Sequence, residues 1–181
     1  MRRRAALMLC ATPMLAWPQG LLASQARLGG VLLVRHASTE PGLGDPAHFR
    51  LGDCSTQRNL SAQGRAESAA MGEWFRRHGL QARAVFTSQW CRCQETARLA
   101  WGQAVDWPAL NSTFAGQGQP ERQLAELRER LHRLPAGALE IWVTHQVIMT
   151  ALAPAYPAMG EGFLLDRHGQ LRARGMMTPD A

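Results

Sequence analysis

Short apolar runs alternate along the chain with longer stretches in which apolar residues recur every three or four positions. The runs predict strands over 31–34, 83–87 and 139–144, a weak strand near 104–107, and a final hairpin around the turn at 167–170. The periodic stretches predict helices over 61–78, 91–101, 120–133 and 146–153. Strands that alternate with helices in this way are typical of an α/β fold.

Two of the predicted helices carry an apolar stripe that we assign to the core. In the first helix, Ser61 is a suitable N-cap and Gly79 a suitable stop. The length of 181 residues and the hydrophobic fraction of 46% fit one domain with a substantial core. The residues assigned to the two stripes are Ala66, Ala69, Ala70 and Trp74, and Leu124, Leu127, Leu131 and Leu134.

Arginine and histidine follow the ends of three predicted strands. Arg35 and His36 come directly after the first strand, Arg92 begins the helix that follows the second, and His145 follows the strand at 139–144. Ligands of open α/β sheets bind beyond the carboxyl ends of the strands, so these side chains are expected at one site. Guanidinium groups and a helix N-terminus favour a ligand with several anionic oxygens, such as phosphate.

The order and spacing of these segments resemble the histidine phosphatase superfamily, which contains phosphoglycerate mutases and small phosphohistidine phosphatases. Arg35-His36-Ala37 resembles the signature of the family, and the segment from Ser88 to Ala97 resembles its second arginine motif. Val143-Thr144-His145 is similar to its second histidine motif, and Asn59-Leu60-Ser61 to its helix start. The resemblance implies a three-layer α/β/α sandwich with a mostly parallel central sheet.

The resemblance also implies the chemistry of the site. His36 would attack the phosphorus of a phosphate monoester, while Arg35, Arg92 and His145 would hold the oxygens of the transferring group. Such a site needs no metal ion and no cofactor, and its partner is a small phosphorylated substrate. Further substrate-binding candidates lie in the long loop over 37–60, which would cover the site: Ser38, Thr39 and Arg58.

The acid that protonates the leaving oxygen is not evident in the sequence. Where many family members have Glu in a Leu-x-Glu stretch, this chain reads Leu110-Asn111-Ser112, and Gln146 instead of Asp follows His145. A serine hydroxyl is too weak an acid for this role. The candidates from flanking loops are Glu40, Asp45, Asp53 and Glu121, each of which also fits a solvated loop charge.

The first 26 residues have the pattern of a secretory signal peptide. Arg2, Arg3 and Arg4 form a basic start, an apolar stretch follows, and small residues suited to cleavage occur at 23–26. The mature domain would then cover residues 27–181 and be periplasmic or secreted, with no stable membrane span after cleavage. An uncleaved N-terminal anchor is the alternative.

Charge and cysteine content add to this description. Loss of the three N-terminal arginines lowers the formal charge from +6 to +3, and no basic run with interleaved aromatic residues indicates a nucleic-acid partner. If the site has the expected geometry, Cys54 lies near Cys91 or Cys93, and an oxidising compartment would permit a disulfide with either. Three buried thiols are the alternative.

The main hypothesis is an exported phosphatase that hydrolyses a phosphate monoester through a phosphohistidine intermediate. Two alternatives remain open: a phosphotransferase or mutase of the same superfamily, and a catalytically weak protein that binds a phosphoryl ligand. The sequence leaves the oligomeric state and the substrate open.

Overall fold

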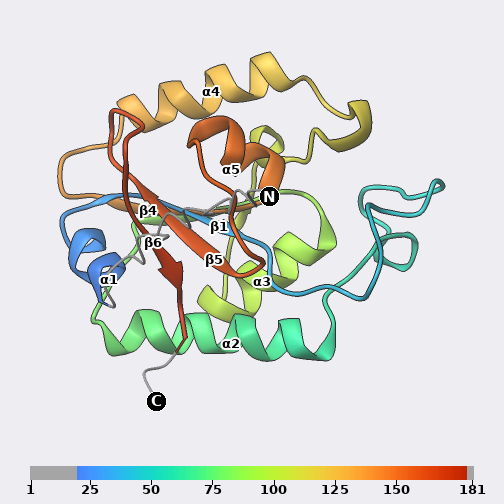
Figure 1. The fold of residues 1–181 in the computed structure, drawn as a ribbon, viewed down its shortest axis with the longest axis horizontal. Coiled ribbons are helices and arrows are strands. Elements are labelled where there is room, and N and C mark those ends of the chain that lie inside the picture. Colours follow the sequence, from blue (N-terminus) through green and yellow to red (C-terminus); the bar gives the residue numbers. More distant parts are fainter. Residues whose placement is uncertain (1–19, 179–181) are drawn as a thin grey trace, which may run out of the picture.

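The computed structural model describes residues 20–178, which form a six-stranded sheet between two layers of helices (Figure 1). The strands are β1 (Gly30–Arg35), β2 (Ala84–Thr87), β3 (Val105–Asp106), β4 (Leu139–Thr144), β5 (Glu161–Leu165) and β6 (Leu171–Met176). The α-helices are α1 (Leu21–Ala26), α2 (Ala62–Arg77), α3 (Cys91–Trp101), α4 (Pro120–His132) and α5 (Gln146–Leu152). Every element predicted from the sequence is present, with ends shifted by at most one residue.

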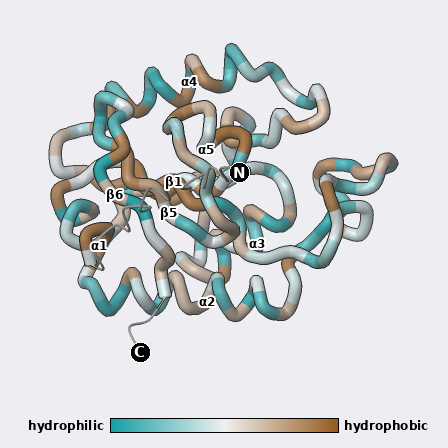
Figure 2. The backbone as a smooth tube through the Cα atoms, viewed as in Figure 1, coloured by the Kyte–Doolittle hydropathy of each residue, from teal (hydrophilic) through white to brown (hydrophobic). Residues whose placement is uncertain are grey.

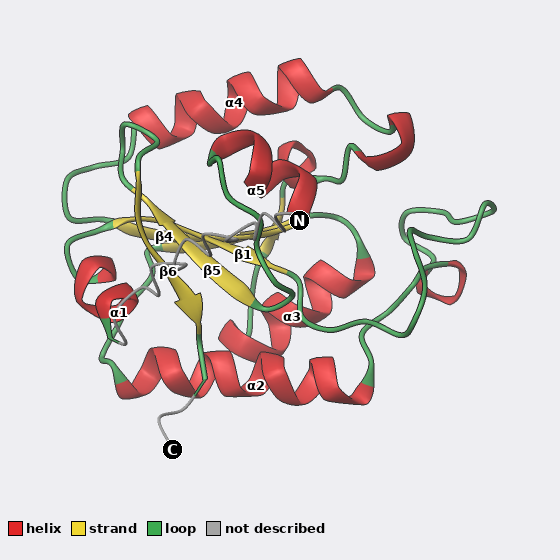
Figure 3. Cartoon of the chain, in the orientation of Figure 1, coloured by secondary structure: helices red, strands yellow, loops and turns green. Residues whose placement is uncertain are grey.

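The sheet has the strand order β3-β2-β4-β1-β5-β6. Strands β3, β2, β4 and β1 are parallel, whereas β5 runs antiparallel to β1 and β6 antiparallel to β5. Helices α1, α2 and α3 cover one face of the sheet, and α4 and α5 cover the other (Figure 3). The predicted three-layer sandwich with a mostly parallel sheet is therefore confirmed.

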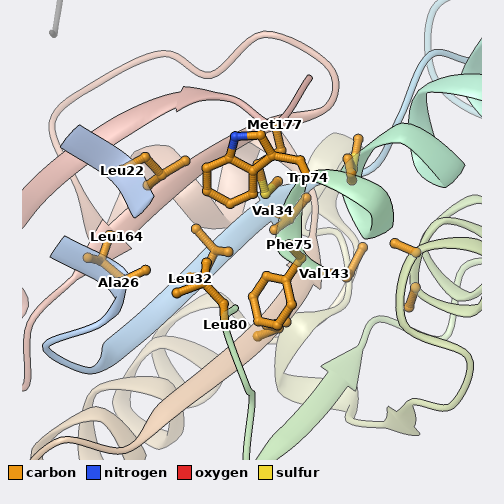
Figure 4. Packing of buried hydrophobic residues seen from close by; sticks show 14 of the residues in the cluster. Leu22, Ala26, Leu32, Val34, Trp74, Phe75, Leu80, Val143, Leu164 and Met177 are labelled. Atoms are coloured by element: carbon orange, nitrogen blue, oxygen red, sulfur yellow. The ribbon is translucent and has the colours of Figure 1, made fainter. Parts of the chain in front are cut away.

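Both faces of the central strands are buried, which explains their continuous apolar runs. In β1, Leu32 and Val34 point toward α1 and α2. Figure 4 shows them in the cluster of buried apolar residues on this side of the sheet. Val31 and Leu33 point the other way, into the cluster under α4 and α5. Along α4, by contrast, hydrophobic and hydrophilic residues alternate because its outer face meets solvent (Figure 2).

The predicted buried face of α2 is partly wrong. Trp74 is buried as predicted, but Ala66 and Ala69 are exposed. The other buried residues of the helix are Ser68, Met71 and Phe75 with two glycines. A Cβ at Gly64 would collide with the carbonyl oxygen of Ser38, and a Cβ at Gly72 with that of Ala100. The helix therefore turns its glycines inward, where the backbones approach closely, and its alanines outward.

The segment that precedes β1 is a helix that the sequence analysis did not predict. Residues 1–19 of the predicted signal peptide lie outside the described residues, but residues 21–26 form α1, which packs against β5 and β6. Leu22, Ala23 and Ala26 are buried, and Figure 4 shows Leu22 and Ala26 within the core. A cleavage point after residue 26 would remove this helix, so that boundary stays a prediction.

Among residues 20–178, no helix combines the length and the apolar character needed to cross a membrane.

Candidate active site

The carboxyl ends of β1, β4 and β2 lie side by side because these three strands are parallel neighbours. His36, His145 and Ser88 are the residues that directly follow them. The backbone N–H of His36 donates to the carbonyl oxygen of Thr144, and that of Ser88 to the carbonyl oxygen of Val143. The strand ends predicted to meet at one site are thus joined by hydrogen bonds.

A cleft of about 210 Å³ opens at these strand ends. Four of its lining residues are those predicted to act on the phosphoryl group: Arg35, His36, Arg92 and His145. Of the three predicted substrate-binding residues, Arg58 lines the cleft, whereas Ser38 and Thr39 do not. A larger cleft of about 550 Å³ lies between β2, β3 and α4, and none of the motif residues lines it.

His36 is held in one tautomer by its own backbone. Its Nδ1 lies 2.9 Å from the carbonyl oxygen of Ala37, which can only accept, so Nδ1 carries the proton. Burial, followed by the charge of Arg92, lowers the pKa of His36 to about 3. The ring is therefore neutral near pH 7, and Nε2 presents a free lone pair in the cleft.

Thr96 fixes the segment that follows His36. Its hydroxyl donates to the carbonyl oxygen of Arg92 at 2.7 Å and accepts the backbone N–H of Ala37 at 3.1 Å. Through this one side chain, the segment that follows His36 is joined to the first turn of α3, which carries Arg92.

His145 is also neutral but has both ring nitrogens engaged. Its Nε2 donates to the hydroxyl of Ser88 at 2.8 Å, while Nδ1 lies 3.5 Å from Nη2 of Arg92, which can only donate. Burial and then the charge of Arg92 lower the pKa of His145 well below its usual value. Nδ1 would donate to a phosphate oxygen only after the ring gains a proton.

Three guanidinium groups surround the cleft with unused donors. Arg35 donates to the carbonyl oxygen of Pro157, and Arg58 donates to the hydroxyl of Thr39 and the carbonyl oxygen of Gly42. Within residues 20–178, Arg35, Arg58 and Arg92 each have a buried Nε without a hydrogen-bond partner. Burial lowers the pKa values of Arg35 and Arg58, and the charges of the neighbouring guanidinium groups lower them further. This crowding of unsatisfied cations favours an anionic ligand.

Asp45 is the carboxylate that reaches this cluster. Its oxygens accept Nη1 of Arg92 at 2.8 Å and Nη2 at 3.1 Å, and they also accept Nε1 of Trp90 and the backbone N–H of Arg58. Burial alone would raise the pKa of Asp45, but the hydrogen bonds and charge of Arg92 lower it overall. In this conformation Asp45 is an ionised partner of Arg92.

The other predicted acids lie away from the cleft. Glu40 and Glu121 are exposed, and Asp53 pairs with the exposed Arg50 at 2.8 Å. Ser112 lines the cleft, and its hydroxyl accepts the backbone N–H of Phe114. Asp45 is thus the one carboxylate among the described residues that line the cleft.

Ser38 and Thr39 hold the loop in place. Ser38 donates its backbone N–H and its hydroxyl to the two carboxylate oxygens of Glu67 on α2, both at 2.9 Å. The hydroxyl of Thr39 accepts Nη1 of Arg58 at 2.6 Å. Thr39 therefore orients a cleft arginine, and Ser38 anchors the loop to α2.

Cys54 and Cys91 form a disulfide that joins the long loop to the first residue of α3, next to Arg92. The free thiol of Cys93 is fully buried and lies 3.6 Å from the carbonyl oxygen of Thr144. Burial raises the pKa of Cys93 to about 12, so it remains a thiol. The described residues contain no group of three or more His, Cys, Asp or Glu side chains placed to hold a metal ion.

Comparison with known proteins places the chain in a family. The sequence profile of the histidine phosphatase superfamily (branch 1) matches residues 31–140, more than half of the chain. The chain belongs to the histidine phosphatase superfamily. His145 lies just beyond the matched segment, but the structure brings it within 5.5 Å of His36, measured between ring centroids. No curated protein matches the chain in sequence.

Solved structures of the same fold include the protein histidine phosphatase SixA complexed with tungstate. It is 18% identical, with a TM-score of 0.54 over 81% of this chain and 96% of that one. A variant of TTHB049 from Thermus thermophilus is 21% identical, with a TM-score of 0.54 over 81% and 98% of the chains. A putative alpha-ribazole-5'-P phosphatase from Escherichia coli is 17% identical, with a TM-score of 0.51 over 68% and 76%. At these identities the likeness establishes the fold.

Proposed function

We propose that this histidine phosphatase superfamily member hydrolyses a phosphate monoester through a phosphohistidine intermediate on His36. The observation that carries the proposal is the free Nε2 of a neutral, oriented imidazole in a cleft with three unsatisfied guanidinium groups. A neutral imidazole is a competent nucleophile. Cations fixed around the phosphoryl group stabilise the charge that its oxygens carry in the transition state.

The first test is hydrolysis of phosphate monoesters by the wild-type protein and by His36→Gln. We expect the variant to lose at least ~10⁴-fold in kcat, because no other side chain replaces the attacking nitrogen. Binding of inorganic phosphate, measured by calorimetry, should persist in the variant because the arginines remain. Retention of wild-type kcat by His36→Gln would refute the proposal.

The mouth of the cleft supports a substrate whose leaving group is uncharged and has an apolar face. Leu43 is 90% exposed and Phe114 45% exposed, and both line the cleft together with Val147. Gln117 and Gln146 add neutral hydrogen-bonding groups. An aryl or similar ring would cover these apolar side chains, whereas a second charged group would meet no partner among them.

A matched pair of substrates tests this preference. Phe114→Ala should raise KM for benzyl phosphate by about 5–10-fold, which corresponds to the loss of part of one aromatic contact. The same variant should leave KM for methyl phosphate unchanged within about twofold. An equal change in both KM values would contradict a contact between Phe114 and the leaving group.

A second candidate function is a phosphoryl-ligand binding protein with weak catalysis. The observation that favours it is the pairing of Asp45 with Arg92, which leaves no uncommitted carboxyl group among the described cleft residues. This candidate predicts that inorganic phosphate binds while neither aryl nor alkyl phosphates are turned over.

Export to an oxidising compartment is also proposed. The pattern of residues 1–26 and the disulfide between Cys54 and Cys91 support it, since disulfides persist mainly outside the cytosol. The test is cell fractionation of the full chain expressed in a bacterium, with the mass of the recovered protein. A shortened chain with an oxidised cysteine pair in the periplasm is expected; a full-length, reduced chain in the cytosol would contradict export.

A further inference from the structure

The proposed reaction requires a proton for the leaving oxygen, and among the described residues that line the cleft a single carboxyl group could supply it. Ser112 stands where the family motif implies a glutamate, but its hydroxyl is far too weak an acid. Gln117 and Gln146 also line the cleft and do not titrate. Of the described cleft residues, this leaves Asp45.

Asp45 binds the two terminal nitrogens of Arg92, which are the atoms that an incoming phosphoryl group would use. Both terminal nitrogens of Arg92 donate to the two oxygens of Asp45, and the side chains are 5% and 6% exposed. A phosphoryl group bound in the same forked manner needs the same two N–H groups. Substrate and Asp45 therefore compete for one guanidinium.

We propose that Asp45 is the general acid of this phosphatase, and that it takes up this role when the phosphoryl group of the substrate displaces its carboxylate from Arg92. The inference rests on the proposed function. A rotation of the Asp45 side chain is sufficient for this displacement, while the Cys54–Cys91 disulfide keeps the same loop attached to the start of α3. The displaced carboxyl group remains beside the phosphoryl group that it has made way for.

The charges around Asp45 support this exchange. Arg92 from α3 forms an ion pair with Asp45, while Arg58 donates its backbone N–H and Trp90 its ring N–H to the carboxylate, and the Arg58 side chain lines the same cleft. Arg35, His36 and His145 line the same cleft. While paired with Arg92, Asp45 has a lowered pKa. After displacement it loses that ion pair and lies beside a dianion, and both changes favour its protonated form.

The reaction balances with these groups. The Nε2 lone pair of His36 attacks phosphorus, the bond from phosphorus to the leaving oxygen breaks, and the carboxyl proton of Asp45 moves to that oxygen. The products are a neutral alcohol, phosphohistidine and the Asp45 carboxylate. Water then attacks phosphorus and gives a proton to Asp45, while the phosphorus–nitrogen bond breaks and returns its electron pair to His36. Inorganic phosphate leaves and His36 is neutral again, while Asp45, which took up its proton from solvent when the substrate displaced it, returns that proton to solvent as it pairs with Arg92 again.

The test compares wild-type protein, Asp45→Asn and Asp45→Glu on two substrates. Benzyl phosphate releases a weakly acidic alcohol that needs a proton, whereas 4-nitrophenyl phosphate releases an acidic phenol that leaves readily. We expect Asp45→Asn to lower kcat/KM for benzyl phosphate by about 10²–10⁴-fold and for 4-nitrophenyl phosphate by less than about tenfold. The decline of the benzyl phosphate rate at high pH should disappear in Asp45→Asn.

Two further variants keep the test decisive. Asp45→Glu retains a carboxyl group and should keep the ratio of the two rates within about tenfold of the wild-type ratio. Asp53→Asn, on the same loop but exposed, should change neither rate by more than about twofold. Thermal melts of each variant show whether it is folded, and if Asp45→Asn is not, the ratio measured with Asp45→Glu decides the question.

Three results would overturn the inference. An equal loss for both substrates in Asp45→Asn would make Asp45 a positioning residue for Arg92. A gain for both would mean that Asp45 only obstructs the cleft. A shift of the rate ratio by more than about 10²-fold in a folded Asp45→Glu would show that a carboxyl group at this position does not protonate the leaving group. Failure of the proposed function is separate, because it shows as full activity in His36→Gln.

Discussion

Each end of β4 lies beside an ion pair between an arginine and a buried carboxylate, and only one of the two pairs faces the candidate active site. Near the start of the strand, Glu140 accepts Nε and Nη2 of Arg130 at 2.8 and 2.9 Å and Nε1 of Trp142 at 3.0 Å. The guanidinium of Arg130 also lies 4.1 Å from the centre of the Phe86 ring. Glu140 also lies 3.9 Å from Nε of Arg83, and both arginines reach solvent, with side chains 37% and 51% exposed, so water screens their charges.

Beyond the other end of β4, Arg92 and Asp45 form a similar forked ion pair, but the charges that surround it are different. Arg35 and Arg58 add two more cations, and Asp45 is the one carboxylate among the described cleft residues. All three arginines keep a buried, unpartnered Nε. An arginine–carboxylate pair alone therefore does not mark a ligand-binding site. A ligand-binding site is marked by an excess of buried cations whose hydrogen-bond donors are unused.

Removing the arginine of each pair distinguishes the two ends of β4 most strongly. Arg92→Met should lower kcat/KM by about 10²–10³-fold, because one fixed cation on the phosphoryl group is lost. Arg130→Met should leave kcat/KM within about threefold but lower the free energy of unfolding by about 2–3 kcal/mol, because Glu140 stays buried. Steady-state kinetics and urea titrations check both. A large loss of kcat/KM in Arg130→Met together with an unchanged kcat/KM in Arg92→Met would show that Arg92 does not belong to the active site.

The Cys54–Cys91 disulfide lies beside the Arg92–Asp45 pair and not beside the Arg130–Glu140 pair. Replacing Cys54 and Cys91 together by alanine should lower the free energy of unfolding by about 2–4 kcal/mol, because a loop with a sequence separation of 37 residues is no longer closed. The same loss should follow from reducing the wild-type protein, as measured by urea titration with and without dithiothreitol. A double variant whose stability still responds to dithiothreitol would contradict this explanation.

The buried histidines of the cleft should also make the stability of the protein depend on pH. Since the pKa of His36 is lowered to about 3 from 6.5, the unfolded chain binds a proton that the folded protein excludes between these values. Stability should therefore fall with decreasing pH in this window, by up to ~2 kcal/mol from His36 between pH 6.5 and pH 5. His145 acts in the same direction. Thermal melts of wild-type protein and His36→Gln should show a smaller decline in the variant; equal slopes would contradict a buried neutral His36.

The smallest effects should come from charges outside both pairs. Glu40 is exposed, and Asp53 pairs with Arg50 on the surface. Glu40→Gln and Asp53→Asn should leave kcat/KM for benzyl phosphate within about twofold, since exposed charges contribute little. A larger selective loss for this substrate in either variant would identify that residue as the proton donor instead of Asp45.

Much of the fold could be predicted because β1 and β4 are buried on both faces and therefore read as apolar runs. The alternation with periodic helices then fixes the class of fold. Helix α1 was missed because its small and apolar residues continue the pattern that predicts a signal peptide. The face of α2 was partly missed because Gly64 and Gly72, which have no apolar side chain, set how closely the helix packs.

Within the site, the residues at strand ends could be found from their order in the sequence, but their partners could not. Asp45 and Arg92 are 47 positions apart and meet through a loop without periodicity. Cys91 and Cys93 were equivalent candidates in the sequence. Side chains two residues apart on a helix point in directions that differ by ~200°. Only one of Cys91 and Cys93 can therefore face the loop that carries Cys54.

In the proposed reaction, His36 carries the phosphoryl group between substrate and water. The most direct measurement is rapid mixing of the protein with 4-nitrophenyl phosphate, an alkaline quench, and mass spectrometry of the intact chain and its peptides. We expect one added phosphoryl group on the peptide that contains His36, lost on acid treatment and absent in His36→Gln. Turnover at the wild-type rate with no phosphoryl group on His36 at any quench time would contradict the claim.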